Sequence, residues 1–208
     1  MQGNIRILQK IVSRTGSSKI LSFAEPHVLK ALQILLRESY VSRKSLCKHL
    51  QIGEGAVKTL ILHLKREGLA DSVRAGTFLT KKGSKFVNEF NEIMVAECFV
   101  GKSEFTKTRN NHAVLLRNAS EKVKSGIGQR DAAIIYGASG AMTMIFHKNK
   151  FVFPGEETDC LKSDLRTRRV LFTSLRPHED DVIILVSAND PFTAEIAAKN
   201  SALFTIAK

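Results

Sequence analysis

Basic side chains between Arg43 and Lys82 form the clearest chemical pattern in this 208-residue chain. Lys58 and Thr59 could donate hydrogen bonds to base edges, which present distinct patterns of acceptors in the major groove of DNA. The surrounding cations would contact phosphates, because Lys and Arg commonly pair with the nucleic-acid backbone. We expect these phosphate contacts at Arg43, Lys44, Arg66, Arg74, Lys81 and Lys82. The chemistry that this pattern indicates is the recognition of double-stranded DNA.

The net charge of the chain agrees with a polyanionic partner. It is +12, and the isoelectric point is about 9.8. Residues 1–97 contain 16 Lys and Arg against 8 Asp and Glu, whereas residues 98–208 contain 16 against 12. Two-thirds of the excess (+8 of +12) therefore lies in the first half. Because many basic proteins never bind nucleic acid, the placement of the charges matters more than their sum.

Three helices are expected to position these residues. Pro26 suits the first turn of a helix whose apolar stripe runs to residue 36. Ser42 is a suitable N-cap for a second helix, Arg43–Leu50. After a Gly-bearing turn, a third helix is expected from Glu54 to Glu67. Two short helices, a tight turn and a longer third helix are typical of a helix-turn-helix.

A hairpin after the third helix makes the pattern more specific. Strands are predicted at Leu69–Arg74 and Phe78–Thr80, joined around a glycine. Thr80 would then cap a further helix that runs from Lys81 to about Glu97. This order of helices, hairpin and helix predicts a winged helix-turn-helix domain over residues 24–97, preceded by a basic, partly frayed arm over residues 1–23.

The third helix is predicted to bury one face and to present the other to DNA. At 100° per residue, its buried stripe consists of Val57, Leu60, Ile61 and Leu64. The outward face then contains Gly55, Lys58, Thr59, Leu62, His63 and Arg66. Gly55 would let the DNA backbone approach closely because it has no side chain. We therefore expect Gly55 and His63 to join the DNA-contacting residues named above.

The second half alternates predicted strands and helices, which favours an α/β layered domain over residues 113–208 after a polar linker or edge segment at 98–112. The expected fold class is therefore α+β overall. Within this half, Gln129, Arg130 and Asp131 open a predicted helix. They could mark a ligand pocket, because Arg binds carboxylate and phosphate in a forked geometry, or they could be ordinary surface capping residues.

Motifs for catalysis are absent from the second half, so no enzyme activity and no cofactor are expected. The glycines at 126, 128, 137 and 140 match neither the phosphate-binding P-loop nor the dinucleotide fingerprint. A cluster of Glu156, Glu157 and Asp159 could hold a divalent ion, but its position beside Pro154 and Gly155 favours a solvated loop instead. Cys47, His49 and His63 have no zinc-site spacing, so no metal site is expected. Three widely separated cysteines suit a reducing cytoplasm, and no membrane segment is expected.

Two segments resemble those of a family of archaeal winged-helix proteins, and this resemblance implies a transcriptional regulator. Residues 53–60 (GEGAVKTL) resemble the family's Gly-Glu-Gly-x-Val-Arg/Lys-Thr-Leu segment, and residues 126–134 (GIGQRDAAI) resemble part of its C-terminal domain of unknown function. The resemblance extends from about residue 24 onward. The family commonly has Glu where this chain has Gly128, so a role that depends on that carboxylate does not carry over.

Together these features predict a cytoplasmic DNA-binding transcriptional regulator whose second domain senses a small-molecule effector or mediates assembly. A homodimer is expected, because two-fold pairing doubles the short site that one winged helix contacts. Ile93, Met94 and Phe99 are candidates for the dimer contact. The alternative is an enzyme of unknown chemistry in the C-terminal domain, with the winged helix used for targeting or for protein interaction.

Overall fold

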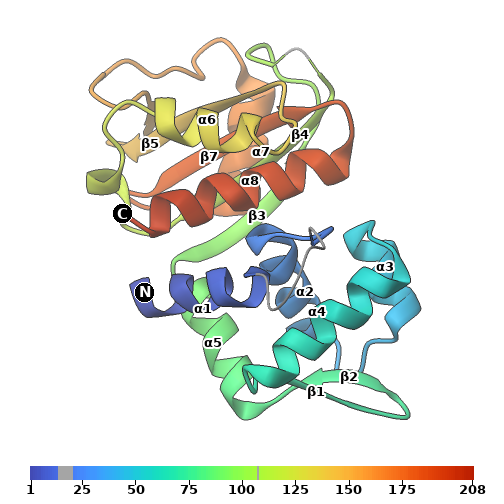
Figure 1. Ribbon diagram of the computed structural model, residues 1–208. Coiled ribbons are helices and arrows are strands. Elements are labelled where there is room, and N and C mark those ends of the chain that lie inside the picture. The colour runs from blue at the N-terminus through green and yellow to red at the C-terminus, as the bar shows by residue number, and fades with distance from the viewer. Residues whose placement is uncertain (14–20, 107) are drawn as a thin grey trace. The chain divides into compact units, whose positions relative to one another are not determined.

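Helices α2 (Glu25–Arg37), α3 (Arg43–Leu50) and α4 (Glu54–Arg66) form the helix-turn-helix part of the chain. The computed structural model describes residues 1–13, 21–106 and 108–208 (Figure 1). Ser42 caps α3 as expected, because its Oγ accepts a hydrogen bond from the backbone N–H of Ser45 (3.1 Å). The predicted inward stripe of α4 is buried. The sequence therefore placed these three helices correctly, within a residue or two at their ends.

The wing is a two-stranded antiparallel hairpin of β1 (Ala70–Val73) and β2 (Gly76–Leu79). A short bridge ties it to the second residue before α3, because Val41 and Thr77 exchange two backbone hydrogen bonds (2.8 and 2.9 Å). Thr80 then caps α5 (Lys81–Asn91), with its Oγ1 accepting from the N–H of Gly83 (3.0 Å). These contacts hold the wing beside α4.

Helix α5 ends at Asn91, six residues before the expected Glu97, and strand β3 follows at Met94–Val100. The alternation of β3 explains the difference, since Ala96, Cys98 and Val100 pack on one core cluster while the residues between them point to the other face. In the sequence, Ile93 and Met94 happen to continue the apolar stripe of α5, although the helix has already ended. Met94 is buried, so it is not an exposed dimer contact, whereas Phe99 remains exposed.

The N-terminal residues form helix α1 (Gln2–Val12), so this part of the chain is not a frayed arm. Leu8 and Ile11 are buried, and Asn4 Nδ2 donates to Glu89 Oε2 of α5 (2.5 Å). Lys10 forms an ion pair with Glu67 at the end of α4 (2.8 Å). Two basic residues of the expected arm, at positions 14 and 19, lie outside the described residues.

The chain separates into two compact units, Met1–Phe90 and Asn91–Lys208, so the boundary expected at Glu97 falls inside β3. The second unit contains an antiparallel sheet in the order β3-β4-β7-β5-β6. Its further strands are β4 (Asn110–Leu116), β5 (Gly140–His147), β6 (Lys150–Val152) and β7 (Val182–Ala188). This sheet confirms the α+β class, and part of the expected linker belongs to β4.

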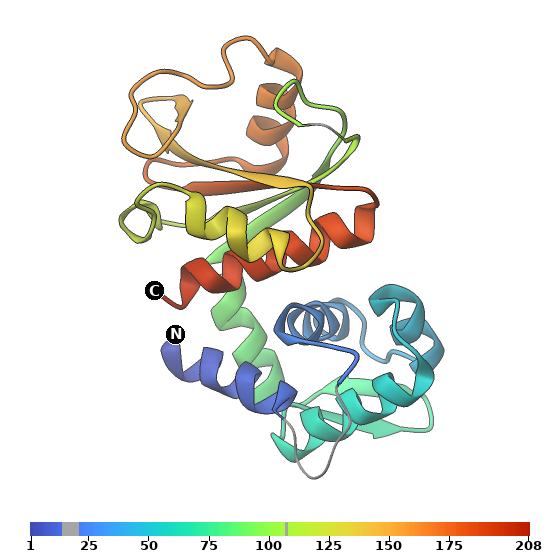
Figure 2. The ribbon, with the colours of Figure 1, turned by 45° about the horizontal axis from the view of Figure 1, so that its top comes forward.

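Helices cover both faces of this sheet (Figures 1 and 2). Helices α6 (Ile127–Ile134) and α8 (Pro191–Ile206) pack together on one face, and α7 (Leu165–Leu175) packs on the other. A short 3-10 helix, η1, occupies Ser120–Lys122. Because helices lie on both sides, the central strand β7 is buried along its whole length.

A buried carboxylate ties two loops of the second unit together. Asp181, just before β7, is fully buried and accepts a hydrogen bond from Arg117 Nη1 (2.6 Å). It also accepts from the backbone N–H groups of Asn118 (3.1 Å) and His178 (2.8 Å). Burying a carboxylate is costly unless it is paired and hydrogen-bonded, and here both conditions are met. The end of β4 and the start of β7 are thereby fastened together.

Candidate nucleic-acid interface

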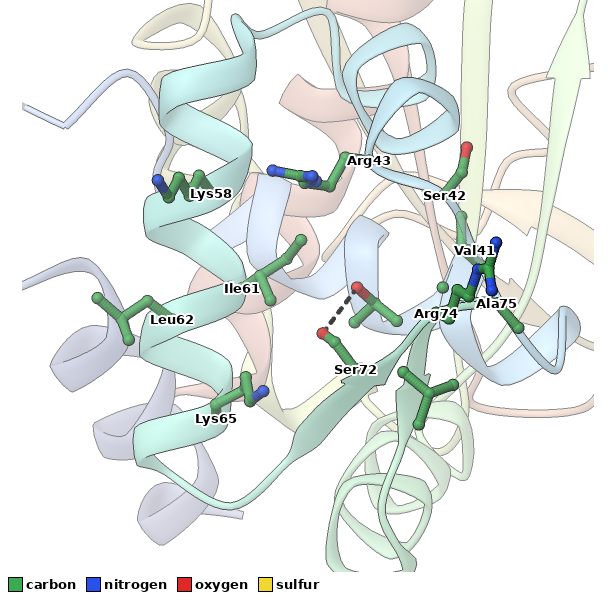
Figure 3. A pocket seen from close by; sticks show the side chains of 13 residues that line it. Val41, Ser42, Arg43, Lys58, Ile61, Leu62, Lys65, Ser72, Arg74 and Ala75 are labelled. Atoms are coloured by element: carbon green, nitrogen blue, oxygen red, sulfur yellow. Dashed lines mark hydrogen bonds between the residues drawn. The ribbon is translucent and has the colours of Figure 1, made fainter.

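A groove of about 530 Å³ runs between α4 and the wing (Figure 3). Lys58, Ile61, Leu62 and Lys65 line it from α4, and the wing lies on the opposite side. Further lining residues are Val41, Ser42, Arg43, Ser72, Val73, Arg74, Ala75, Gly76 and Thr77. The sequence-predicted residues Arg43, Lys58 and Arg74 are therefore brought together, although they come from three separate elements.

Among the described residues, the charged ones that line this groove are all cations. They are Arg43, Lys58, Lys65 and Arg74, all exposed. Lys65 is partly neutralised, because its Nζ lies 2.8 Å from Asp71 Oδ1 at the wing. The hydrogen bond from Lys65, helped by the N–H of Ser72, lowers the pKa of the Asp71 carboxyl, so this pair is ionic at neutral pH. Arg43 also has an acidic neighbour, because its Nη1 lies 3.9 Å from Glu54 Oε1, but both side chains are exposed. Lys58 and Arg74, with Arg43, give the groove a positive potential suited to phosphates.

The start of α4 presents an open surface. Gly55 is exposed, and a methyl group added at its Cα would touch nothing within 4 Å. Thr59 is half-buried, and its Oγ1 donates to the backbone O of Gly55 (3.0 Å). The Thr59 hydroxyl proton is thus used within the helix, which leaves its oxygen lone pairs for an outside donor. Lys58, one turn into the helix, is the exposed cation next to Gly55.

His63 does not belong to the outward face, contrary to the prediction from helical periodicity. It is buried, with its Nδ1 2.6 Å from the backbone O of Ile11 and its ring 6.3 Å from that of Phe23, centroid to centroid. Helix α1 covers this side of α4. The error arose because the sequence pattern treated the first residues as an arm rather than as a packed helix.

The other predicted phosphate contacts lie outside the groove. Lys44, Arg66 and Lys81 are exposed and do not line it. Lys82 is exposed too, but its Nζ donates to the backbone O of Glu67 (2.7 Å) and so caps the end of α4. Sequence reasoning missed Lys65, although its position two turns after Lys58 places both on one helical face.

Of the three residues predicted to bind a ligand, only two are exposed. Gln129 is buried, its Nε2 donates to Thr205 Oγ1 (3.1 Å) and its backbone O accepts from Ser201 Oγ (2.8 Å). It therefore fastens α6 to α8 and is not a pocket residue. Arg130 and Asp131 are exposed and paired with each other (3.2 Å). Helical periodicity explains the split, because Gln129 lies on the inward face.

Four groups of the second unit that could serve catalysis or metal binding are two buried thiols, a buried lysine and a loop carboxylate. Burial raises the pKa of Cys98 to about 11 and that of Cys160 to about 12, so both thiols are weak nucleophiles at neutral pH. The buried Lys199 forms ion pairs with Glu97 and Glu195. In the acidic loop cluster, Asp159 pairs with Arg168. Within the described ranges, no three His, Cys, Asp or Glu residues gather as metal ligands.

Comparisons with known proteins show that the two halves of the chain are similar to different families. Residues 28–85 match the family model described as "PH0730-like, N-terminal domain", and residues 107–206 match "Domain of unknown function (DUF4443)". No curated protein matches the chain. Among solved structures, the chain is similar to "Hypothetical protein PH0730 from Pyrococcus horikoshii OT3", with a TM-score of 0.66 and 23% identity over 84% of this chain and 90% of that one.

At 23% identity, the similarity shows a shared fold only. The similar structure comes from an archaeon, and the sequence resemblance was also to archaeal proteins. No helix among the described residues has the length and apolar character that spanning a membrane requires. The chain therefore joins a region similar to PH0730-like N-terminal domains to a region similar to DUF4443 domains.

Proposed function

We propose that the Met1–Phe90 unit binds double-stranded DNA, with α4 in the major groove and one phosphodiester strand between α4 and the wing. The observation that carries this proposal is the groove lined by four cations and no carboxylate. Phosphates need such a surface, because neutralising them releases condensed counterions and supplies most of the sequence-independent affinity.

The dimensions of α4 suit this role. Its 13 residues span roughly 20 Å, and an α-helix fits the major groove of B-DNA. Its first turn offers free backbone N–H groups at the positive end of the helix dipole, which favour a phosphate. Lys58 would contact a base edge, while Arg43 and Arg74 would hold the backbone on either side. The exposed Lys44, Arg66 and Lys81 would contact more distant phosphates.

The whole chain would then act as a transcriptional regulator, with the Asn91–Lys208 unit sensing a ligand or mediating assembly, and without enzymatic activity. Two observations support a non-catalytic second unit, namely the protonated thiols and the fully paired Lys199. A homodimer would double the number of base contacts. Phe99, which is exposed, is the remaining candidate for its interface among the residues named from the sequence.

Lys58→Ala should weaken binding to a selected DNA site by about 1–3 kcal/mol and relax the preference at one base position. The measurement is binding of the full chain to DNA sites enriched by in vitro selection, at several salt concentrations. For wild type, the logarithm of the affinity should fall with a slope near −0.9 per neutralised phosphate. Lys85→Ala, an exposed lysine on α5, serves as the matched control. Unchanged affinity and preference in Lys58→Ala would refute the assignment of α4.

Gly55→Ala should separate stability from DNA binding. An added methyl group meets nothing in the free protein, and alanine favours helix over glycine, so stability should rise by up to about 1 kcal/mol. The same methyl group would obstruct a closely approaching DNA backbone and should reduce affinity about tenfold or more, an effect of roughly 1.4 kcal/mol. Thermal unfolding and DNA titration measure the two effects. An equally tight complex would show that DNA does not approach Gly55.

Two exposed apolar residues in the same groove, Leu62 and Val73, favour a protein-interaction module as the second candidate function. An apolar contact of this kind would depend weakly on salt, whereas the phosphate contacts would depend on it steeply. The salt series described above therefore discriminates between the two functions. Leu62→Ser should leave DNA affinity nearly unchanged if the DNA proposal is correct.

A further inference from the structure

The outer edge of β5 in the second unit is open along half its length. Strand β6 pairs with β5 only at Ile145, Phe146 and His147, whereas β7 pairs with it from Gly140 to Ile145 on the other side. The backbone N–H of Phe146 donates to the backbone O of Asp181, so the backbone groups of Phe146 point toward β7. In an antiparallel pair, the N–H and C=O groups of successive residues point alternately toward and away from the neighbouring strand. The backbone N–H and C=O groups of Ala141 and Thr143 therefore point away from β7, toward the edge that β6 does not cover.

Two cavities of about 180 and 310 Å³ lie along this open edge. Both are lined by Arg130, Ala141 and Met142, so the two cavities adjoin at the edge of β5, and together they are called the β5 groove. The smaller cavity is also lined by Phe105, Thr106, Ser139, Gly140, Leu185 and Ser187. The larger one is also lined by Ser125, Gly126, Ile127, Thr143 and Phe153. Their combined size is in the range of small-ligand sites.

Among the residues that the structure describes, Arg130 is the only charged one that lines either cavity. Its guanidinium pairs with Asp131, but both side chains are more than half exposed, and exposed pairs of this kind contribute little. A ligand carboxylate could therefore displace Asp131 at small cost and bind in forked geometry. The buried Thr143 Oγ1 has no hydrogen-bond partner among the described residues, and a polar ligand group would supply one.

We propose that the β5 groove binds the carboxy-terminal end of an extended peptide. The peptide backbone would pair with Ala141 and Thr143 as an added strand, and its terminal carboxylate would bind Arg130. Edge pairing of this kind supplies main-chain hydrogen bonds, while adjoining cavities accept alternate side chains. The apolar walls, Met142, Phe105 and Ile127, favour apolar side chains at those positions. This inference goes beyond DNA binding and does not depend on it.

The test uses the full chain and pools of tripeptides with apolar side chains. One pool has free carboxyl ends, and a matched pool is amidated at that end. Protein-observed NMR should show that the free-carboxylate pool shifts the backbone amide signals of Ala141 and Thr143. The amidated pool should bind about tenfold more weakly or worse, because it lacks the charge-assisted pair. A third pool is acetylated at its amino end and free at its carboxyl end, so it mimics the tail of a protein. Binding of this pool indicates a protein tail as the ligand, whereas binding only of peptides with a free amino end indicates a short peptide.

Arg130→Ala should reduce the affinity for the free-carboxylate pool at least tenfold and abolish its advantage over the amidated pool. Because Arg130 is exposed, the variant should unfold at an unchanged temperature. Arg169→Ala, an exposed arginine on α7 that does not line the β5 groove, is the matched control and should bind like wild type. Equal binding of the two pools, shifts elsewhere in the protein, or unchanged binding by Arg130→Ala would each overturn the proposal.

Discussion

Replacing Asp181 with alanine should lower the free energy of unfolding of the Asn91–Lys208 unit by about 3–5 kcal/mol. The substitution removes a fully buried carboxylate and leaves Arg117 with an uncompensated charge. It also leaves the backbone N–H groups of Asn118 and His178 without their acceptor. A buried donor without a partner costs about 1–3 kcal/mol by itself, so the losses reinforce one another.

Amide hydrogen exchange in β7 measures this effect, because the slowest amides of that strand report the opening of the sheet. Asp131→Ala is the matched control, since it removes an exposed carboxylate that is also paired with an arginine. That control should change stability by less than about 0.5 kcal/mol. If Asp181→Ala behaves like Asp131→Ala, then the carboxylate does not fasten the two strands in the way described above.

Gly83→Ala should destabilise the Met1–Phe90 unit by about 1–3 kcal/mol, although helix propensity alone predicts a gain of about 1 kcal/mol. A methyl group at this position would lie 1.8 Å from the backbone O of Leu69, well inside van der Waals contact. The obstacle is backbone rather than a flexible side chain. Helix α5 would have to move away from the residue that leads into the wing.

Urea unfolding of the chain, followed through the signals of the first unit, provides the measurement. Gly3→Ala in α1 is the control, because a methyl group there meets nothing within 4 Å and should follow helix propensity. Opposite signs for the two substitutions are expected. A gain in stability for Gly83→Ala would mean that α5 and the Leu69 backbone are not held as close as the structure places them.

Local signals were sufficient to predict the helix-turn-helix and the wing from the sequence. Caps at Ser42 and Thr80 mark where helices begin, and these hydrogen bonds form between residues three apart. The inward stripe of α4 has a strict helical period, which few other structures produce. The grouping of Arg43, Lys58 and Arg74 then followed from the fold, since the three elements that carry them are adjacent in a winged helix.

Contacts between distant residues explain what the sequence did not reveal. His63 is removed from the surface by Ile11, which lies 52 positions earlier. Gln129 is buried by its hydrogen bond to Thr205, which lies 76 positions later in the sequence. Strand β3 was mistaken for the end of a helix because its apolar residues satisfy both periods over a short stretch. None of these errors is visible in a local pattern, because each depends on which remote segment covers the residue.

The order of strands in the sheet has a consequence for how the protein is made. Strand β7 lies between β4 and β5, yet it is synthesised after both of them and after β6. While the ribosome is still translating residues 117–181, β4 and β5 have no neighbour on the side that β7 will occupy. The whole winged-helix unit has been synthesised once the ribosome has passed Phe90, so this unit can form its internal contacts before the second unit is made. Folding on the ribosome should therefore proceed in two stages, and a chain truncated before residue 182 should expose two unpaired strand edges and aggregate.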